Sequence, residues 1–293
     1  GSLRNPGNFN NVVGLRPSGD RVPRWPTRLG WFTLGVQGPL GRTVGDVALM
    51  LSVIAGPDRR SPIASELPGS TFAQPLERDF RGVRVAWSRD LGGLPVDPRV
   101  TTVLESRRHV LAELGCEVVE ATPDLRGADE SFTTLRAWNF AFAHAEQLRT
   151  QRHLIKESVI WNTEEGLKLS GLDVARAEAQ RTQLFEHVSA FMQEHEFLLC
   201  PVNQVPPFDI DVEYPTEING VPMEHYFAWM RSAYYISATG LPAISVPCGF
   251  TAEGLPVGIQ IVGRPHDDLG VLRLAHAFEQ ATQAGRRRPP VVG

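Results

Sequence analysis

The sequence predicts an α/β fold in which a mixed central β-sheet is covered by helices on both faces. A strand, a helix and a second strand follow one another within residues 83–121, and such a unit implies parallel strands joined by a crossover. Residues 240–263 contain two further strands joined by a tight connection. The run at 197–201 is apolar on both faces, which is typical of a strand inside a sheet.

Length and composition favour one domain over residues 1–293. The chain has 293 residues, 42% of them apolar, which is enough for the core of one large α/β domain or two small ones. The formal net charge of −4 gives no electrostatic reason to expect nucleic acid as a partner. The longest apolar run, at 47–55, is shorter than the ~18 residues that a membrane-spanning helix needs, so no membrane partner is expected.

The cysteines and histidines favour neither a metal site nor a disulfide framework. Cys116, Cys200 and Cys248 are odd in number and far apart, which predicts a reducing, cytoplasmic location. The eight histidines show no ligand spacing. A glycine-rich phosphate loop and a Gly-x-Ser-x-Gly motif are both absent from the sequence. We therefore expect no metal and no cofactor.

The first third of the chain predicts a strand and a helix separated by loops. Residues 11–15 are predicted to form a strand, and residues 44–55 a helix. Thr43 before this helix and Asp46 three residues later have a pattern close to that of a capping box. This helix is apolar on nearly every side, so we expect it to be buried. The polar, proline-rich stretch at 57–80 is expected to be a loop.

The middle of the chain predicts a βαβ unit and then a long helical region. The unit consists of a strand at 83–87, one helix over 97–115 that begins at an Asp-Pro pair, and a strand at 117–121. Residues 129–196 are predicted to be mostly helical. Residues 201–222 are rich in proline and acid without a clear period, and a loop of that length is expected to be functional or mobile.

The last part of the chain predicts two more helices around the pair of strands. Residues 225–235 are expected to form an aromatic-rich helix, and residues 269–282 a helix capped by Asp267. Residues 284–293 form the tail, and its run of arginines and prolines at 286–290 is expected to be disordered.

Four segments in order along the chain share a pattern with one enzyme family. The chain starts Gly-Ser-Leu-Arg-Asn-Pro, and residues 12–17 read Val-Val-Gly-Leu-Arg-Pro. Residues 38–58 carry Gly-Pro, Arg-Thr-Val and Ala-Gly-Pro-Asp, and residues 240–263 carry two Gly-Leu-Pro strands. Together they resemble the amidase signature family over nearly the whole chain, most strongly at 1–58 and 240–280.

The resemblance implies a serine hydrolase that cleaves a small-molecule carboxamide. It implies that Ser2 is the acylating nucleophile, and that Gly1 is a glycine whose backbone helps to bind the oxyanion. A serine hydroxyl is a weak nucleophile and needs a base, while the oxyanion of acyl transfer needs backbone N–H groups aimed at one point. Read without the rest of the chain, Gly1 and Ser2 resemble the remnant of a cleaved tag.

The resemblance also implies a lysine base and a second serine, the latter in a cis peptide, both upstream of the nucleophile. The only lysines here are Lys156 and Lys168, both far downstream in polar stretches that are typical of a solvated surface. We therefore expect these 293 residues to be the C-terminal part of a longer enzyme and to hydrolyse nothing alone. Whether the missing part lies on the same chain is left open.

Three further residues are candidates for substrate binding. Arg4 can clamp a carboxylate through its guanidinium group, although a buried pair with an upstream aspartate is the simpler interpretation. Gln37 and Cys248 can line the pocket, although both are equally compatible with ordinary loop and core positions.

Two other functions fit the same resemblance. One is a subunit like the glutamine-hydrolysing subunit of transamidation amidotransferases, which would need partner subunits and an ammonia channel. The other is a non-catalytic binding protein that keeps the amidase fold. The sequence does not indicate which amide is cleaved, and it leaves homodimer formation open.

Overall fold

The computed structural model describes residues 1–289 and confirms the predicted fold class. In that part of the chain a seven-stranded mixed sheet has the order β2-β1-β8-β9-β5-β3-β4. Strand β3 runs parallel to β4 and β5, and the other neighbouring pairs are antiparallel. The strands are β1 (Val13–Arg16), β2 (Leu40–Gly41), β3 (Arg84–Trp87), β4 (Glu117–Glu120), β5 (Phe197–Pro201), β8 (Ala243–Phe250) and β9 (Pro256–Gly263).

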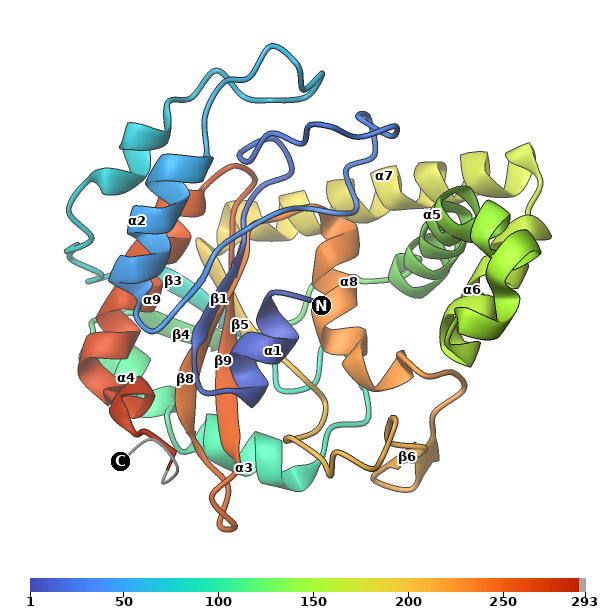
Figure 1. The fold of residues 1–293 in the computed structure, drawn as a ribbon. Helices are drawn as coiled ribbons and strands as arrows, with labels where there is room; N and C mark the ends of the chain where they lie inside the picture. Colours follow the sequence, from blue (N-terminus) through green and yellow to red (C-terminus); the bar gives the residue numbers. More distant parts are fainter. Residues whose placement is uncertain (290–293) are drawn as a thin grey trace.

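Helices cover both faces of this sheet (Figure 1). One face packs against α2, α3, α4 and α9, and the other against α5, α7 and α8. The short α1 lies beside α8 and packs on β1, β8 and β9. The helices are α1 (Arg4–Phe9), α2 (Val44–Ile54), α3 (Pro98–Glu105), α4 (Arg108–Glu113), α5 (Ala128–Gln151), α6 (Glu157–Leu167), α7 (Gly171–Glu194), α8 (Arg231–Thr239) and α9 (Asp268–Thr282).

The paired strands β8 and β9 form the centre of the sheet and are buried on both faces. Their apolar residues therefore alternate between two separate cores: Ile244 belongs to the core under α2 and α9, whereas Ala243 belongs to the core under α7 and α8. Strand β1 pairs with β8 in the register Leu15–Ile244. This pairing holds the N-terminal residues close to the middle of the sheet.

Helix α2 has the predicted capping box but not the predicted burial. The Thr43 side chain accepts from the Asp46 N–H, and the Asp46 carboxylate accepts from the Thr43 N–H. Its inner face is buried, whereas Leu49 and Val53 are 65% and 78% exposed. The prediction of a fully buried helix is wrong because α2 lies in an outer layer, where the sheet covers only one side of it.

Two predicted helices have different bounds in the structure. The single helix expected over 97–115 is divided into α3 and α4 at a turn where Arg107 N–H donates to the Leu104 carbonyl and Val110 N–H to the Arg107 carbonyl, each three residues earlier. The helix expected over 225–235 starts only at Arg231, after a 3₁₀ turn at Ala228–Met230. The preceding Phe227 is buried against the rings of Phe132 and Tyr234.

The predicted loops and tail contain some ordered structure. Residues 57–80 include a 3₁₀ helix at Gly69–Ala73, and residues 201–222 include a small hairpin of β6 (Glu217–Ile218) and β7 (Val221–Pro222). In the tail, Ala284–Arg286 forms a 3₁₀ turn and Arg287 lies 4.3 Å over the Phe250 ring, so the expected disorder is wrong there. Residues 290–293 of that tail lie outside the described residues.

None of the helices within residues 1–289 combines the length and the apolar character that crossing a membrane would require.

Candidate active site

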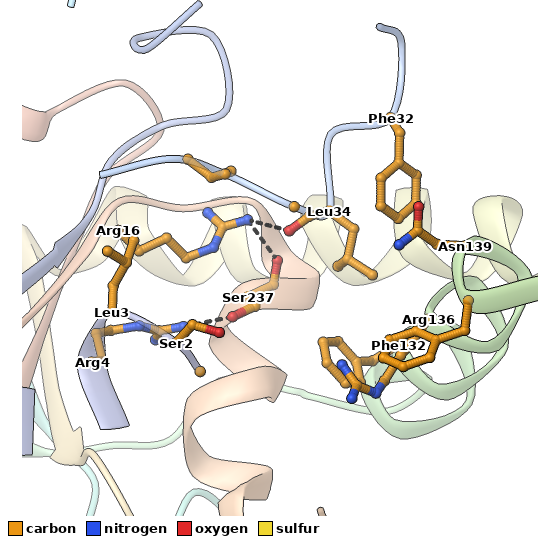
Figure 2. A pocket seen from close by; sticks show the side chains of 14 residues that line it. Ser2, Leu3, Arg4, Arg16, Phe32, Leu34, Phe132, Arg136, Asn139 and Ser237 are labelled. Carbon is orange, nitrogen blue, oxygen red and sulfur yellow. Dashed lines mark hydrogen bonds between the residues drawn. The ribbon is translucent and has the colours of Figure 1, made fainter. Parts of the chain in front are cut away.

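Ser2 lies on the turn that leads into α1, at the edge of a cavity of about 190 Å³. Its side chain is exposed rather than packed into the core. Figure 2 shows Ser2, Leu3 and Arg4 on one side of this cavity, Arg136 and Phe132 of α5 on the other, and Ser237 of α8 between them. The lining residues are Gly1, Ser2, Leu3, Arg4, Arg16, Phe32, Leu34, Gly35, Val36, Phe132, Arg136, Asn139, Phe140 and Ser237.

The turn that carries Ser2 is fixed by a close approach to β1 and by hydrogen bonds to β9. A Cβ atom on Gly14 would lie 2.1 Å from the Leu3 carbonyl oxygen, so only glycine fits in β1 at this position. From α1, Asn8 accepts a hydrogen bond from the Gly258 N–H of β9 and donates from Nδ2 to Asn203 Oδ1 at 2.7 Å. The local sequence thus holds the serine turn rigidly against the central strands.

Arg4 follows the serine by two residues and is buried beneath the cavity. Its guanidinium group donates to Gln260 Oε1, to the Ala233 carbonyl at 2.8 Å and to Ser237 Oγ at 2.5 Å. Burial lowers the pKa of Arg4 to about 10. Within residues 1–289 its hydrogen-bond acceptors are neutral, so the structure contains no carboxylate pair for it there. Its role in substrate binding stays a prediction.

Arg16, at the end of β1, is hydrogen-bonded to the loop at 34–36 that lines one wall of the cavity. Its Nη2 donates to the Leu34 carbonyl at 3.2 Å and to the Ser237 carbonyl at 3.3 Å (Figure 2). Burial, together with the charges of Arg4 and Arg181, lowers the pKa of Arg16 to about 9. The sequence contains this arginine in a family motif but gives no sign that it lines the cavity.

The sequence does not predict that α5 lines the cavity, which it does through Phe132, Arg136, Asn139 and Phe140. Arg136 donates from Nη2 to the Tyr226 hydroxyl at 2.7 Å, and its guanidinium carbon lies 4.4 Å from the centre of the Phe140 ring. Its Nε is buried without a hydrogen-bond partner. The only signal in the sequence is one arginine inside an apolar and aromatic stretch, and that pattern does not say which face of the helix meets a cavity.

Gln37 and Cys248 do not line the cavity, which corrects both expectations. The Gln37 side chain is exposed, and its neighbours Gly35 and Val36 line the cavity instead. Cys248 lies on β8 with its side chain in the core that packs against α3 and α9. Successive side chains of a strand point to opposite faces of the sheet, and that of Cys248 points to the face covered by α3 and α9. The Ser2 cavity lies on the other face.

The two lysines lie on the surface, as the sequence predicts. Lys156 pairs with Glu213 at 2.8 Å and Lys168 with Glu165 at 2.5 Å, and all four side chains are at least 40% exposed. Such exposed pairs contribute little to stability. No lysine or histidine of residues 1–289 lines the Ser2 cavity.

The charge of the cavity wall favours anions. Arg4, Arg16 and Arg136 line the cavity, and no aspartate or glutamate of the described residues does. This positive wall therefore stabilises a negative charge that forms beside Ser2. Across residues 1–289, no group of three metal-ligating side chains is close enough to hold a metal ion.

We expect all three thiols to be unreactive in the native protein. Burial raises the pKa of Cys200 and of Cys248 to about 12 and that of Cys116 to about 11, because a buried thiolate is poorly solvated. At pH 8, titration with Ellman's reagent should give almost no colour until the protein is unfolded, when three thiols should react. Fast reaction of any thiol in the native state would contradict this burial.

The same shifts predict a loss of stability in alkali. Because the thiol pKa values are raised by folding, the native state holds its protons more tightly than the unfolded chain does. The thiol contribution to stability is therefore constant below the ordinary pKa of 9.0 and is lost as the pH rises from there towards about 12. Urea titrations between pH 8 and pH 10.5 should show a falling free energy of unfolding, and Cys248→Ser should flatten that fall.

Comparisons with known proteins agree with the fold and show the family. The family described as Amidase matches residues 1–272. An acylamidase of Rhodococcus erythropolis is 34% identical, over 99% of this chain and 61% of its own length. A glutamyl-tRNA(Gln) amidotransferase subunit of Myxococcus xanthus is 30% identical, over 99% of this chain and 64% of its own length. A solved bacterial aryl acylamidase superposes with a TM-score of 0.83 at 26% identity, over 98% of this chain and 63% of its own.

The mixed sheet between helical layers is an α/β fold, and it places the turn with Ser2 at a cationic cavity beside the central strands. The chain belongs to the amidase signature family. It spans less than two thirds of the length of the curated relatives that it resembles.

Proposed function

We propose that this chain contains the nucleophile and one wall of the active site of an amidase that cleaves a small-molecule carboxamide. The observation that carries this proposal is the position of Ser2, exposed at the edge of a cavity whose wall is cationic. Membership of the family supports hydrolase chemistry, and the residues beside the serine supply the means to stabilise an oxyanion.

The reaction proceeds in two acyl transfers. Ser2 Oγ attacks the amide carbon as a base takes the hydroxyl proton, and the carbonyl oxygen becomes an oxyanion. The C–N bond then breaks, and the proton passes to the departing amine, which leaves an ester on Ser2. Water attacks that ester as the base takes one of its protons; the ester C–O bond then breaks, the base returns the proton to Ser2 Oγ, and the carboxylic acid is released. Gly1 belongs to the backbone that binds the oxyanion, and the charges of Arg4 and Arg16 add to that stabilisation.

The base comes from outside the 293 residues. Lys156 and Lys168 are engaged in surface pairs, and the family resemblance implies a lysine and a second serine upstream of the nucleophile. We therefore propose that these 293 residues hydrolyse no amide alone, and that the complete gene product does. A cytoplasmic location is part of the same proposal, supported by three free, buried cysteines.

An acyl amide is a better candidate substrate than glutamine in a transamidation complex. The acylamidase relative is 34% identical and the amidotransferase relative 30%, and an aryl acylamidase structure superposes at a TM-score of 0.83. The glutaminase alternative is favoured only by the amidotransferase relatives. It predicts that hydrolysis of glutamine depends on added partner subunits, whereas an amidase needs none.

A fluorophosphonate probe tests the proposal directly. The complete gene product should be labelled at Ser2, hydrolyse acetanilide without a partner protein, and lose both properties when the serine is changed. The 293-residue chain should show neither. Acetanilide turnover by the 293-residue chain alone would overturn the assignment of the base, and absence of labelling in an active complete protein would overturn the nucleophile.

A further inference from the structure

Arg136 is the cavity arginine that donates the fewest hydrogen bonds to the protein. A guanidinium group offers five N–H donors, and the one hydrogen bond of Arg136 goes to the Tyr226 hydroxyl at 2.7 Å. Its Nε is buried and has no partner. Arg4 and Arg16, by contrast, donate to three protein acceptors each. The cost of an unsatisfied buried donor is relieved when a ligand supplies the acceptor.

The surroundings of Arg136 hold its guanidinium group in place. The group lies 4.4 Å from the centre of the Phe140 ring and 5.0 Å from that of Phe227, and the Tyr226 hydroxyl fixes one end of it. Asn139, one turn further along α5, lines the same cavity. Because the aromatic rings already hold this planar guanidinium group in place, it loses little side-chain entropy when it binds a ligand. It is therefore suited to bind a planar anion such as a carboxylate.

We infer that the amide cleaved at Ser2 carries a carboxylate that Arg136 binds across the cavity, with an apolar body between the two groups. This inference rests on the proposed function. Figure 2 shows Arg136 on the opposite side of the cavity from Ser2. Phe32, Leu34 and Phe132 give the same cavity an apolar lining, so the body of the substrate is apolar. Described residues add no carboxylate to the lining that would compete for Arg136.

Two pairs of amides of matched shape test this assignment in the complete gene product. In each pair a carboxylate is replaced by an isopropyl group: N-phenylsuccinamate against N-phenyl-4-methylpentanamide, and 4-acetamidobenzoate against 4-isopropylacetanilide. The first pair places the charge on the acyl part and the second on the amine part. In one of the pairs the anionic amide should be preferred in kcat/KM by about 10- to 100-fold, as expected for a charge-assisted hydrogen bond.

Variants of Arg136 connect the preference to this residue. Arg136→Met should abolish the preference mainly by raising KM for the anionic amide, while the neutral member changes by no more than about twofold. Arg136→Lys keeps the positive charge but loses the planar, bidentate geometry of the guanidinium group, so it should retain part of the preference for the anionic amide. Arg28→Met is the matched control, because Arg28 also lies over an aromatic ring of α5, Phe142 at 4.7 Å, but is exposed and outside the cavity lining.

A binding readout separates failure of this inference from failure of the proposed function. The preferred anionic amide should protect Ser2 from the fluorophosphonate at lower concentration than its neutral partner does, and Arg136→Met should remove that difference. Equal kcat/KM values and equal protection within both pairs would overturn the inference, as would a variant that slows both members equally. An active enzyme with these results would still be an amidase. Absence of both hydrolysis and labelling would overturn the proposed function, and this inference with it.

Discussion

Replacing Ser2 with alanine should abolish amide hydrolysis by the complete gene product while leaving its fold intact. The Ser2 side chain is exposed at the cavity edge, so removing its hydroxyl deletes no core packing. Because acyl transfer has no alternative nucleophile in the reaction proposed here, the expected loss in kcat is on the order of 10⁶-fold, as for nucleophile removal in other serine hydrolases. Steady-state hydrolysis of acetanilide and labelling by a fluorophosphonate should disappear together.

Two companion variants make the result specific. Ser70→Ala removes a hydroxyl that is also exposed but lies in the 3₁₀ helix at Gly69–Ala73, outside the cavity, and should keep full activity. Ser2→Cys keeps a nucleophile at the same place and should form an acyl-enzyme slowly, with a changed pH profile because a thiol ionises near pH 8.5. Wild-type activity in Ser2→Ala would mean that the family's serine role does not apply to this residue.

Features determined by neighbouring residues in the sequence were predictable. The capping box of Thr43 and Asp46 is a local exchange of hydrogen bonds, and the structure contains it as expected. Asp267 likewise caps α9 through the Gly270 N–H at 2.9 Å. The interior position of β5 followed from its apolar residues on both faces. Each of these features needs only a few consecutive residues.

Features determined by distant contacts were missed. The exposed face of α2 depends on which layer covers the helix, and its all-round apolar sequence does not contain that information. At the break between α3 and α4, Arg107 donates a hydrogen bond to a strand 141 positions later, a contact that no local pattern contains. Likewise, Arg136 enters the site only because α5 lies opposite a serine turn 134 residues earlier, so no local pattern could place it there.

The serine turn itself shows how a local motif and a distant contact act together. Gly14 belongs to the family pattern, but its requirement for glycine arises from the Leu3 carbonyl oxygen, 2.1 Å from where a Cβ would lie. Gly14→Ala should therefore push the turn away from β1 and lower the free energy of unfolding by roughly 3 kcal/mol, the upper part of the usual range for overpacking. The displaced turn should also slow fluorophosphonate labelling of Ser2.

Gly45→Ala is the matched control for this change. A Cβ on Gly45 in α2 would meet only Thr43 Oγ1, at an ordinary 3.7 Å. Alanine also favours the helix over glycine, so this variant should gain up to about 1 kcal/mol and label at the wild-type rate. Urea unfolding and labelling kinetics on both variants measure the difference. If Gly14→Ala were as stable and as quickly labelled as Gly45→Ala, the turn would not depend on its close approach to β1, and the rigid position of Ser2 would need another cause.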